Sequence, residues 1–440
     1  CFFGWFGIAP LMAIVREDLM LTKAQIGNTI IASVAITVLF RLLSGPLCDR
    51  FGARLTYTWL LLLGSLPVMG IGLAQSYESF LLFRLAIGAI GASFVITQYH
   101  TSMMFAPNCV GTANAATAGW GNVGAGATQM VIPLIFSAFL MFGVDKSLGW
   151  RLAMMVPGVV LFFMGLAYYF CTQDAPDGNY KELRAQGRLP PTTDKEHGSF
   201  LLVAKDYRVW VLFVIYAACF GMELTINNIA ALYYYDRFQL DVTTAGLIAG
   251  LFGLMNIFAR ALGGICSDRF AKLRGLKGRV QLLGVVLFLE GIALIAFSRM
   301  PILGLAVAAM LLFGLLVQMA SGATFGVVPF INKKAVGPVA GIVGAGGNAG
   351  AVLAGFLFRI EALATQDVLL LLGVLVTLSP CLVLLVRFSE QVEAEQKEAF
   401  VRAGAEPEEL RVVIVPDEEP AVGVAADEGR EAREAVGAAP

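Results

Sequence analysis

Two arginines lie inside long apolar segments of this sequence, where a charge is costly. Arg41 stands in LFRLLSGPLCDRFGAR, residues 39–54, and Arg260 stands in NIFARALGGICSD, residues 256–268. A lone arginine at membrane depth costs several kcal/mol by insertion scales, so each needs a compensating partner. Two facing guanidiniums could hold a small planar oxyanion through forked hydrogen bonds, which lysine cannot reproduce.

The composition indicates an integral membrane protein. Of the 440 residues, 58% are hydrophobic and 14% are charged, whereas soluble globular proteins have about 25% charged residues. A net charge of −1 gives no electrostatic basis for binding nucleic acid. The scattered cysteines and the two distant histidines suggest neither a disulfide framework nor a metal site. We therefore expect no metal and no cofactor, and no constellation of residues favours an enzyme.

Apolar runs long enough to cross a membrane recur along the chain. A helix needs about 20 residues to cross a hydrocarbon core of ~30 Å. Twelve runs of about this size fall near 1–15, 26–48, 55–74, 79–105, 112–142, 150–171, 208–235, 244–267, 280–298, 301–330, 336–358 and 367–387. The first run is short and begins at Cys1 without a methionine, so we expect it to be truncated. The sequence predicts an all-α membrane fold with twelve transmembrane helices.

A polar, proline-containing break divides the runs into six plus six. We predict an N-terminal half at 1–171, a central cytoplasmic loop at 172–207, a C-terminal half at 208–388 and a disordered acidic cytoplasmic tail at 389–440. Lysine and arginine are concentrated in the even-numbered loops. The positive-inside rule therefore places these loops and both termini in the cytoplasm.

The two halves carry matching strings. RLLSGPLCDRF begins at Arg41 and RALGGICSDRF begins at Arg260, while GNVGA at 121–125 matches GNAGA at 347–351. The matched positions are Arg41 and Arg260, Gly45 and Gly264, Asp49 and Asp268, Arg50 and Arg269, Gly121 and Gly347, Asn122 and Asn348, and Gly124 and Gly350. Both pairs keep the same place within their half, which indicates a duplication. Repeat-built transporters bind their substrate between such halves, near the midplane.

The spacing places both arginines near the middle of the bilayer. Each stands eight residues before Asp49 or Asp268, which mark the predicted cytoplasmic helix ends. At a rise of ~1.5 Å per residue each arginine lies ~12 Å deeper than its aspartate. Because the halves should pack about a two-fold axis, we expect Arg41 and Arg260 to face each other.

The compensating charge has two candidate sources. Each arginine could pair with a buried carboxylate, for which Glu223 and Glu290 are available, although neither has a counterpart in the other half. Alternatively, the missing charge is a bound anion. Asn122 and Asn348 also fall near the midplane, where their amides could donate to that anion or make an interhelical hydrogen bond.

The string G-x3-D-R-F-G-x-R, from Gly45 to Arg54, resembles the loop signature of the major facilitator superfamily. Arg84-x3-Gly88 resembles a second motif of that superfamily. The resemblance implies the major facilitator fold, with twelve helices in two pseudo-symmetric six-helix halves. It also implies conformational roles for the motif residues Gly45, Asp49, Arg50, Gly52 and Arg54, with Gly264, Asp268 and Arg269 in the second half and the paired glycines 121, 124, 347 and 350.

Longer strings resemble one family within that superfamily. AGWGNVGAGATQMVIP (118–133) and GAGGNAGAVLAG (344–355) are similar to the paired glycine-rich signatures of the nitrate/nitrite porter family. LTKAQIGN (21–28), TQDAPDGN (172–179) and the string around Arg260 resemble that family too. These strings cover every part of the chain except the tail.

The resemblance implies an anion bound between the residues that match Arg41 and Arg260. The family's substrate ring is completed by aromatic residues and an asparagine, which match Phe94, Tyr216, Phe220 and Asn122; Asn348 would join them by symmetry. His100 lies where relatives often have an aromatic residue, and it either takes part in proton coupling or is a satisfied interhelical donor.

The resemblance therefore implies a secondary active transporter of nitrate, and of nitrite, in the plasma membrane, coupled to protons. Three alternatives stay open: exchange of one anion for another, transport of a different small oxyanion or carboxylate, and a nitrate receptor that signals without transport. Some eukaryotic relatives need a small accessory membrane protein, which is a further expected partner.

Overall fold

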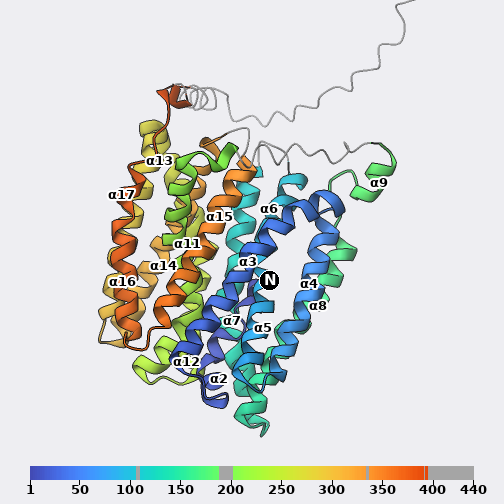
Figure 1. Cartoon of the computed structure of the whole chain (residues 1–440), viewed down its shortest axis with the longest axis vertical. Coiled ribbons are helices and arrows are strands. Elements are labelled where there is room, and N and C mark those ends of the chain that lie inside the picture. The colour runs from blue at the N-terminus through green and yellow to red at the C-terminus, as the bar shows by residue number, and fades with distance from the viewer. Residues whose placement is uncertain (106–109, 188–201, 333–335, 391, 395–440) are drawn as a thin grey trace, which may run out of the picture. The chain divides into compact units, whose positions relative to one another are not determined.

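The computed structural model describes residues 1–105, 110–187, 202–332, 336–390 and 392–394. Long helices run side by side through most of this part of the chain (Figure 1). The elements are α1 (Phe2–Trp5), η1 (Ala9–Leu11), α2 (Met12–Asp18), α3 (Lys23–Phe51), α4 (Ala53–Gly70), η2 (Ile71–Leu73), α5 (Tyr77–Gly88), η3 (Ala89–Ala92), α6 (Ser93–Met104), α7 (Val110–Met141), α8 (Lys146–Cys171), α9 (Tyr180–Ala185), α11 (Tyr207–Phe238), α12 (Val242–Leu254), η4 (Met255–Ile257), α13 (Ala259–Arg299), α14 (Leu303–Phe325), η5 (Val328–Phe330), α15 (Val336–Phe358), α16 (Thr365–Leu378) and α17 (Pro380–Val383). Nearly all of the predicted acidic tail lies outside the described residues.

Within the described ranges, ten helical segments are long and apolar enough to cross a membrane. One of them, Val242–Arg299, contains two of the predicted runs. They meet inside α13 at Gly275, whose φ of 65° and ψ of −152° interrupt the helical backbone. The ten segments thus account for eleven predicted runs, and α1, η1 and α2 occupy the short first one.

The sequence of α3 explains where this helix begins and ends. Thr22 caps its first turn by accepting from the backbone N–H of Gln25, whose side chain accepts from the Thr22 N–H. The helix ends at Gly52, whose φ is 87°. A Cβ atom there would lie 2.4 Å from the carboxylate of Asp174. Only glycine suits both the backbone conformation and this close approach.

The two faces of α3 differ in polarity. Leu39, Leu42 and Leu43 are exposed, whereas Thr37 and Arg41 are buried. Exposed leucines on one side and buried polar residues on the other are typical of a helix that lies between lipid and the protein interior. The buried face of α3 packs against α15, which also packs against α11. Arg41 is therefore directed toward the C-terminal half.

The two halves are joined at one end of the bundle, which we call the Arg16 end; the opposite end is the Asp49 end. Arg16 and Asp236 form an ion pair of 2.7 Å, and the Tyr235 hydroxyl donates to Glu17. Toward the centre, Arg84 of α5 donates to Asn228 of α11 over 2.8 Å. Across the described ranges, the hydrogen bonds and ion pairs found between the halves lie at the level of Arg41 or toward the Arg16 end.

Candidate functional site

Arg41 is a buried cation with neutral partners. Its exposed fraction is 8%. Nη1 donates to the Gly344 carbonyl over 3.1 Å, and Nε and Nη2 each lie 3.4 Å from the Gly91 carbonyl. The guanidinium carbon lies 5.5 Å from the ring centre of Phe94. Among the residues that the structure describes, Arg41 has no carboxylate within ion-pair distance. No described residue therefore compensates its charge.

Arg260, at the start of α13, has different neighbours. Its exposed fraction is 6%, its Nη2 donates to the Tyr216 hydroxyl over 2.7 Å, and its guanidinium lies 5.4 Å from the ring centre of Phe220. Its Nη1 is 3.9 Å from Oε2 of Glu223, and neither atom has a hydrogen-bond partner among the described residues. The expectation of a buried carboxylate partner thus holds for Arg260, as a long ion pair, and not for Arg41.

Four aromatic rings connect the two arginines. Tyr216 and Phe220 stack with centroids 5.1 Å apart and an interplanar angle of 14°. Phe325 meets Tyr216 edge-on at 5.2 Å and Phe94 at 6.5 Å, so it joins rings from the two halves. Arg41 lies over Phe94 at one end of this row of rings, and Arg260 lies over Phe220 at the other end. The structure thus brings the predicted arginines and aromatics together, and it adds Phe325, which sequence reasoning missed.

The two predicted asparagines have different surroundings. Asn122 donates to Oε1 of Glu223 over 3.2 Å, and Asn256 of η4 donates to the same oxygen over 2.9 Å. Asn348 is fully buried, and neither its amide nitrogen nor its oxygen has a partner in the described part of the chain. Asn122 is therefore engaged by a carboxylate, while Asn348 keeps its hydrogen-bonding capacity free. Asn256 was missed, although it opens one of the quoted family strings.

The glycines of α15 allow this helix to pack closely on α11. A Cβ at Gly347 would lie 2.4 Å from the Phe220 ring, and one at Gly350 would lie 2.4 Å from the Ala217 carbonyl. The equivalent glycines of α7 are less confined. No described atom lies within 4 Å of a Cβ added at Gly121, and a Cβ at Gly124 would lie 3.0 Å from the first helix. The close packing that the α15 glycines allow therefore fixes the position of the Phe220 ring, over which the Arg260 guanidinium lies.

At the Asp49 end, the predicted loop residues hold the start of the central loop. Asp49 accepts from the Tyr99 hydroxyl over 2.9 Å. The backbone carbonyls of Asp49 and Arg50 accept from Arg184 of α9. The N–H of Arg54 donates to Asp174 over 2.7 Å, next to Gly52. Asp174, in a quoted family string, was not singled out from the sequence.

The matching loop of the second half is built differently. Asp268 forms an ion pair of 2.7 Å with Arg279, and Arg269 is exposed. Gly45 and Gly264, predicted as a matched pair, are alike in that no described atom lies within 4 Å of an added Cβ. The two loop motifs therefore share their sequence but not their contacts.

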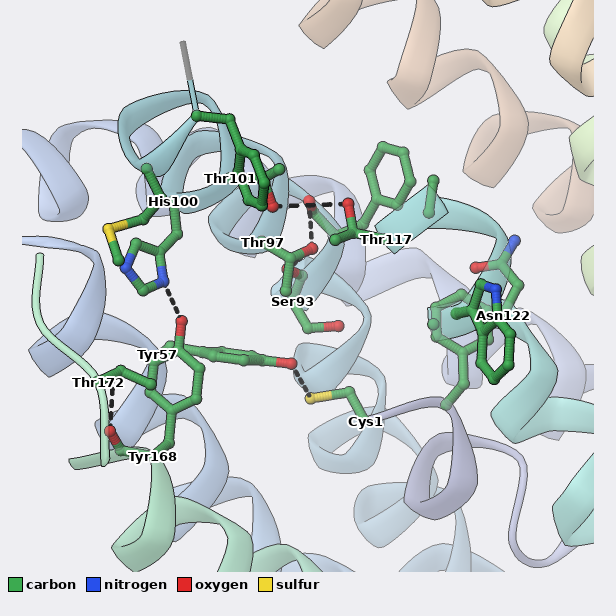
Figure 2. Close-up of a pocket in the computed structure, with 17 residues that line it drawn as sticks. Cys1, Tyr57, Ser93, Thr97, His100, Thr101, Thr117, Asn122, Tyr168 and Thr172 are labelled. Atoms are coloured by element: carbon green, nitrogen blue, oxygen red, sulfur yellow. Dashed lines mark hydrogen bonds between the residues drawn. The ribbon is translucent and has the colours of Figure 1, made fainter. Parts of the chain in front are cut away.

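A cavity of about 500 Å³ lies in the N-terminal half beside this site, between α4, α6, α7 and α8 (Figure 2). Phe94 and Asn122 line it, but neither arginine does. Figure 2 shows His100 directed toward Tyr168, and its ring nitrogens contact the Tyr168 hydroxyl and the Gln173 carbonyl. His100 is therefore a satisfied interhelical hydrogen-bonding residue.

The fold is shared with known transporters. The family model described as Major Facilitator Superfamily matches residues 1–355. A bacterial homologue of the human lysosomal transporter Spinster superposes with a TM-score of 0.63 at 16% identity, covering 87% of this chain and 93% of that one. The xylose transporter XylE from E. coli gives 0.63 at 14% identity, covering 89% and 95%. Identities this low indicate the fold alone, and they confirm the predicted one.

Sequence relatives narrow the family. The "High affinity nitrate transporter 2.5" of Arabidopsis thaliana is 40% identical over 377 residues, which are 85% of this chain and 74% of the relative. The "High-affinity nitrate transporter 2.3" of Oryza sativa is 39% identical, covering 81% and 69%. "Nitrate/nitrite transporter NrtP" of Picosynechococcus is 29% identical, covering 80% and 81%. The chain belongs to the nitrate/nitrite porter family of the major facilitator superfamily, a family of multi-pass membrane transporters and not of enzymes.

Proposed function

We propose that this protein is a secondary active transporter of nitrate and nitrite that binds the anion between Arg41 and Arg260. The observation that carries the proposal is the environment of Arg41, a buried guanidinium without a carboxylate among the described residues, which a row of aromatic rings connects to a second buried guanidinium. A bound anion would supply the counter-charge that the described residues do not provide there. The names of the relatives, which are transporters of nitrate or nitrate and nitrite, support this choice of anion.

The hydrogen-bonding capacity around the arginines suits a small planar oxyanion. Nη1 of Arg260 has no hydrogen-bond partner in the described structure, and two of the three hydrogen bonds of Arg41 are long, so both guanidiniums have donors to offer. The Tyr216 hydroxyl accepts from Arg260 and keeps its own hydrogen to donate. Asn348 adds a buried amide that no described residue contacts by a hydrogen bond.

The connections between the halves support alternating access. They lie at the Arg16 end and at the level of the site, which suits a state open toward the Asp49 end. By the positive-inside rule the Asp49 end faces the cytoplasm. We place the protein in the plasma membrane with both termini cytoplasmic, and the cycle is a rocking of the halves about the site.

Uptake of an anion needs a driving force. Moving one negative charge inward against an inside-negative potential costs ~2.3 kcal/mol per 100 mV. Cotransported protons would offset this cost, and we propose proton coupling for that reason. The alternative is exchange for another anion, which needs no net charge movement.

The test is flux of labelled nitrate and nitrite into proteoliposomes, with and without a proton gradient. Wild type should transport nitrate, and Arg41→Lys should abolish transport because an ammonium cannot form the forked contact. The exposed Arg387→Lys is the matched control and should transport normally. No nitrate flux by wild type would overturn the proposal and favour another small oxyanion or carboxylate, tested by competition, or a receptor. Flux by the purified chain alone would also remove the expected need for an accessory protein.

A further inference from the structure

Glu223 has contacts that anion binding alone does not explain. It lies on α11 and is fully buried. One carboxylate oxygen, Oε1, accepts from Asn122 and Asn256. The other, Oε2, has no hydrogen-bond partner among the described residues and lies 3.9 Å from Nη1 of Arg260. A carboxyl group thus lies beside one of the two cations that the proposed anion must reach.

We propose that Glu223 is the proton-binding group of this transporter, which binds a proton on Oε2 when the anion binds. This inference rests on the proposed function and names its coupling residue. With Glu223 ionised, the arriving anion would share Arg260 with a second negative charge in a buried site. A proton from the aqueous phase forms an O–H bond at Oε2 and removes that second charge. Anion and proton therefore favour each other's binding, and by linkage the effect is reciprocal.

The charge of the site also explains how the empty carrier returns. In the empty state Arg41 and Arg260 contribute two positive charges and Glu223 contributes one negative charge, which leaves one positive charge. In the loaded state the anion replaces the carboxylate charge, so the total is again one positive charge. The loaded and the empty transporter then have the same net charge at the site, so both meet the same electrostatic barrier when they change between their two open states. Without a carboxylate at position 223, the empty site would have two positive charges and would return poorly.

The groups around Glu223 identify it, rather than its neighbour, as the switch. The charged and titratable groups that face it are Arg260 and Glu290 of α13 and Tyr216 of α11. Glu290 is also fully buried, but neither of its oxygens has a partner in the described structure. No described donor or cation contacts its carboxylate, so an ionised Glu290 would have nothing to stabilise its charge. Glu223 has two amide donors and an arginine that stabilise its ionised form, and its Oε2 has no described partner and can take up a proton.

The first test compares Glu223→Gln with the matched control Glu290→Gln in proteoliposomes. Two rates are measured: exchange of labelled nitrate for internal nitrate, and net uptake driven by an inward proton gradient into nitrate-free liposomes. For Glu223→Gln the ratio of net uptake to exchange should fall at least about tenfold. Exchange needs only the nitrate-loaded transporter to change between its two open states, whereas net uptake also needs the empty transporter to return. Glu290→Gln should keep the wild-type ratio. An unchanged ratio in Glu223→Gln, or an equal fall in both variants, overturns the inference.

The second test uses the wild-type protein, so it does not depend on the folding of a variant. Nitrate is added to purified protein in weakly buffered detergent solution containing a pH indicator. About one proton should be taken up per nitrate bound at some pH between about 5 and about 8. Nitrate binding without proton uptake anywhere in this range overturns the inference. Absence of nitrate exchange by wild type would instead overturn the proposed function, so the two failures are distinguishable.

Discussion

Arg41 and Arg260 occupy matching positions in the two halves, yet their surroundings differ. Each lies over a phenylalanine ring at about the same distance, 5.5 Å for Arg41 and 5.4 Å for Arg260. Arg41 is otherwise bonded to backbone carbonyls, whereas Arg260 has the Tyr216 hydroxyl and the Glu223 carboxylate. The duplicated fold therefore provides a symmetric pair of cations in an asymmetric environment.

This difference predicts different roles for the two arginines in anion binding. Arg41 has no carboxylate partner among the described residues, so on the proposed function its counter-charge is the bound anion. Arg260 would be shared between that anion and Glu223, and the binding of anion and proton would be coupled there. Substitutions in the two halves test this difference.

Replacing either arginine with lysine should nearly abolish transport. Arg41→Lys and Arg260→Lys each remove a forked donor, and each should lower nitrate exchange about a hundredfold, equivalent to ~2.7 kcal/mol. Labelled nitrate exchange in proteoliposomes measures the effect. If one lysine variant keeps most of the wild-type rate, the anion is held by a single arginine and the symmetric clamp is wrong.

Removing each charge should affect stability in opposite ways. Arg260→Met leaves Glu223 buried without its cation and should lower the free energy of unfolding by about 2 kcal/mol. Arg41→Met removes an uncompensated charge and should leave stability equal or higher. Thermal unfolding in detergent without nitrate ranks the stabilities of the two variants. Adding Glu223→Gln to Arg260→Met should restore part of the stability that Arg260→Met loses. Equal destabilisation by both methionine variants would contradict the asymmetry.

Alanine at the matched glycines should be tolerated in one half only. Gly347→Ala places a Cβ against the Phe220 ring and should lower stability by about 1.5 kcal/mol, since the ring must shift. Gly121→Ala has free space and should stay near wild type. The unfolding temperatures of the two variants measure this difference. A larger loss of stability in Gly121→Ala than in Gly347→Ala would show that α11 and α15 do not pack closely at Gly347.

The smallest expected effect concerns the hydroxyl on Arg260. Tyr216→Phe keeps the stacked ring but removes the 2.7 Å hydrogen bond to Nη2. We expect nitrate to bind about fivefold more weakly, equivalent to ~1 kcal/mol. Titration of purified protein with nitrate measures the change. An unchanged affinity would mean that this hydroxyl neither positions Arg260 nor contacts the anion.

The helices could be predicted because each apolar run is a local property of the sequence. The run at 208–235 corresponds to α11, Tyr207–Phe238. The boundary near Gly275 was harder to define, since α13 continues on both sides of a single non-helical residue. The short elements η3 and η4 leave no comparable signal, because they continue the apolar runs that contain them.

The residues of the site could be predicted where the duplication repeats them or where they match the family resemblance. Arg41 and Arg260 are matched in sequence, and Phe94, Tyr216 and Phe220 match the family resemblance, so these side chains were expected to lie near the interface of the two halves. The hydrogen bonds of Asn122 and Asn256 to Glu223 depend on how α7 and η4 meet α11, which no pattern within one segment specifies. The chain has 31 phenylalanines, and no motif in the sequence distinguished Phe325 from the others. Tertiary contacts without a repeat to mark them therefore had to come from the structure.

The most direct measurement of the central claim is a structure of the protein determined with nitrate. We predict density for a planar anion within hydrogen-bond distance of both Arg41 and Arg260, next to Phe94 and Phe220. Density bound instead in the neighbouring cavity lined by Thr97 and His100, or in contact with only one arginine, would contradict the account.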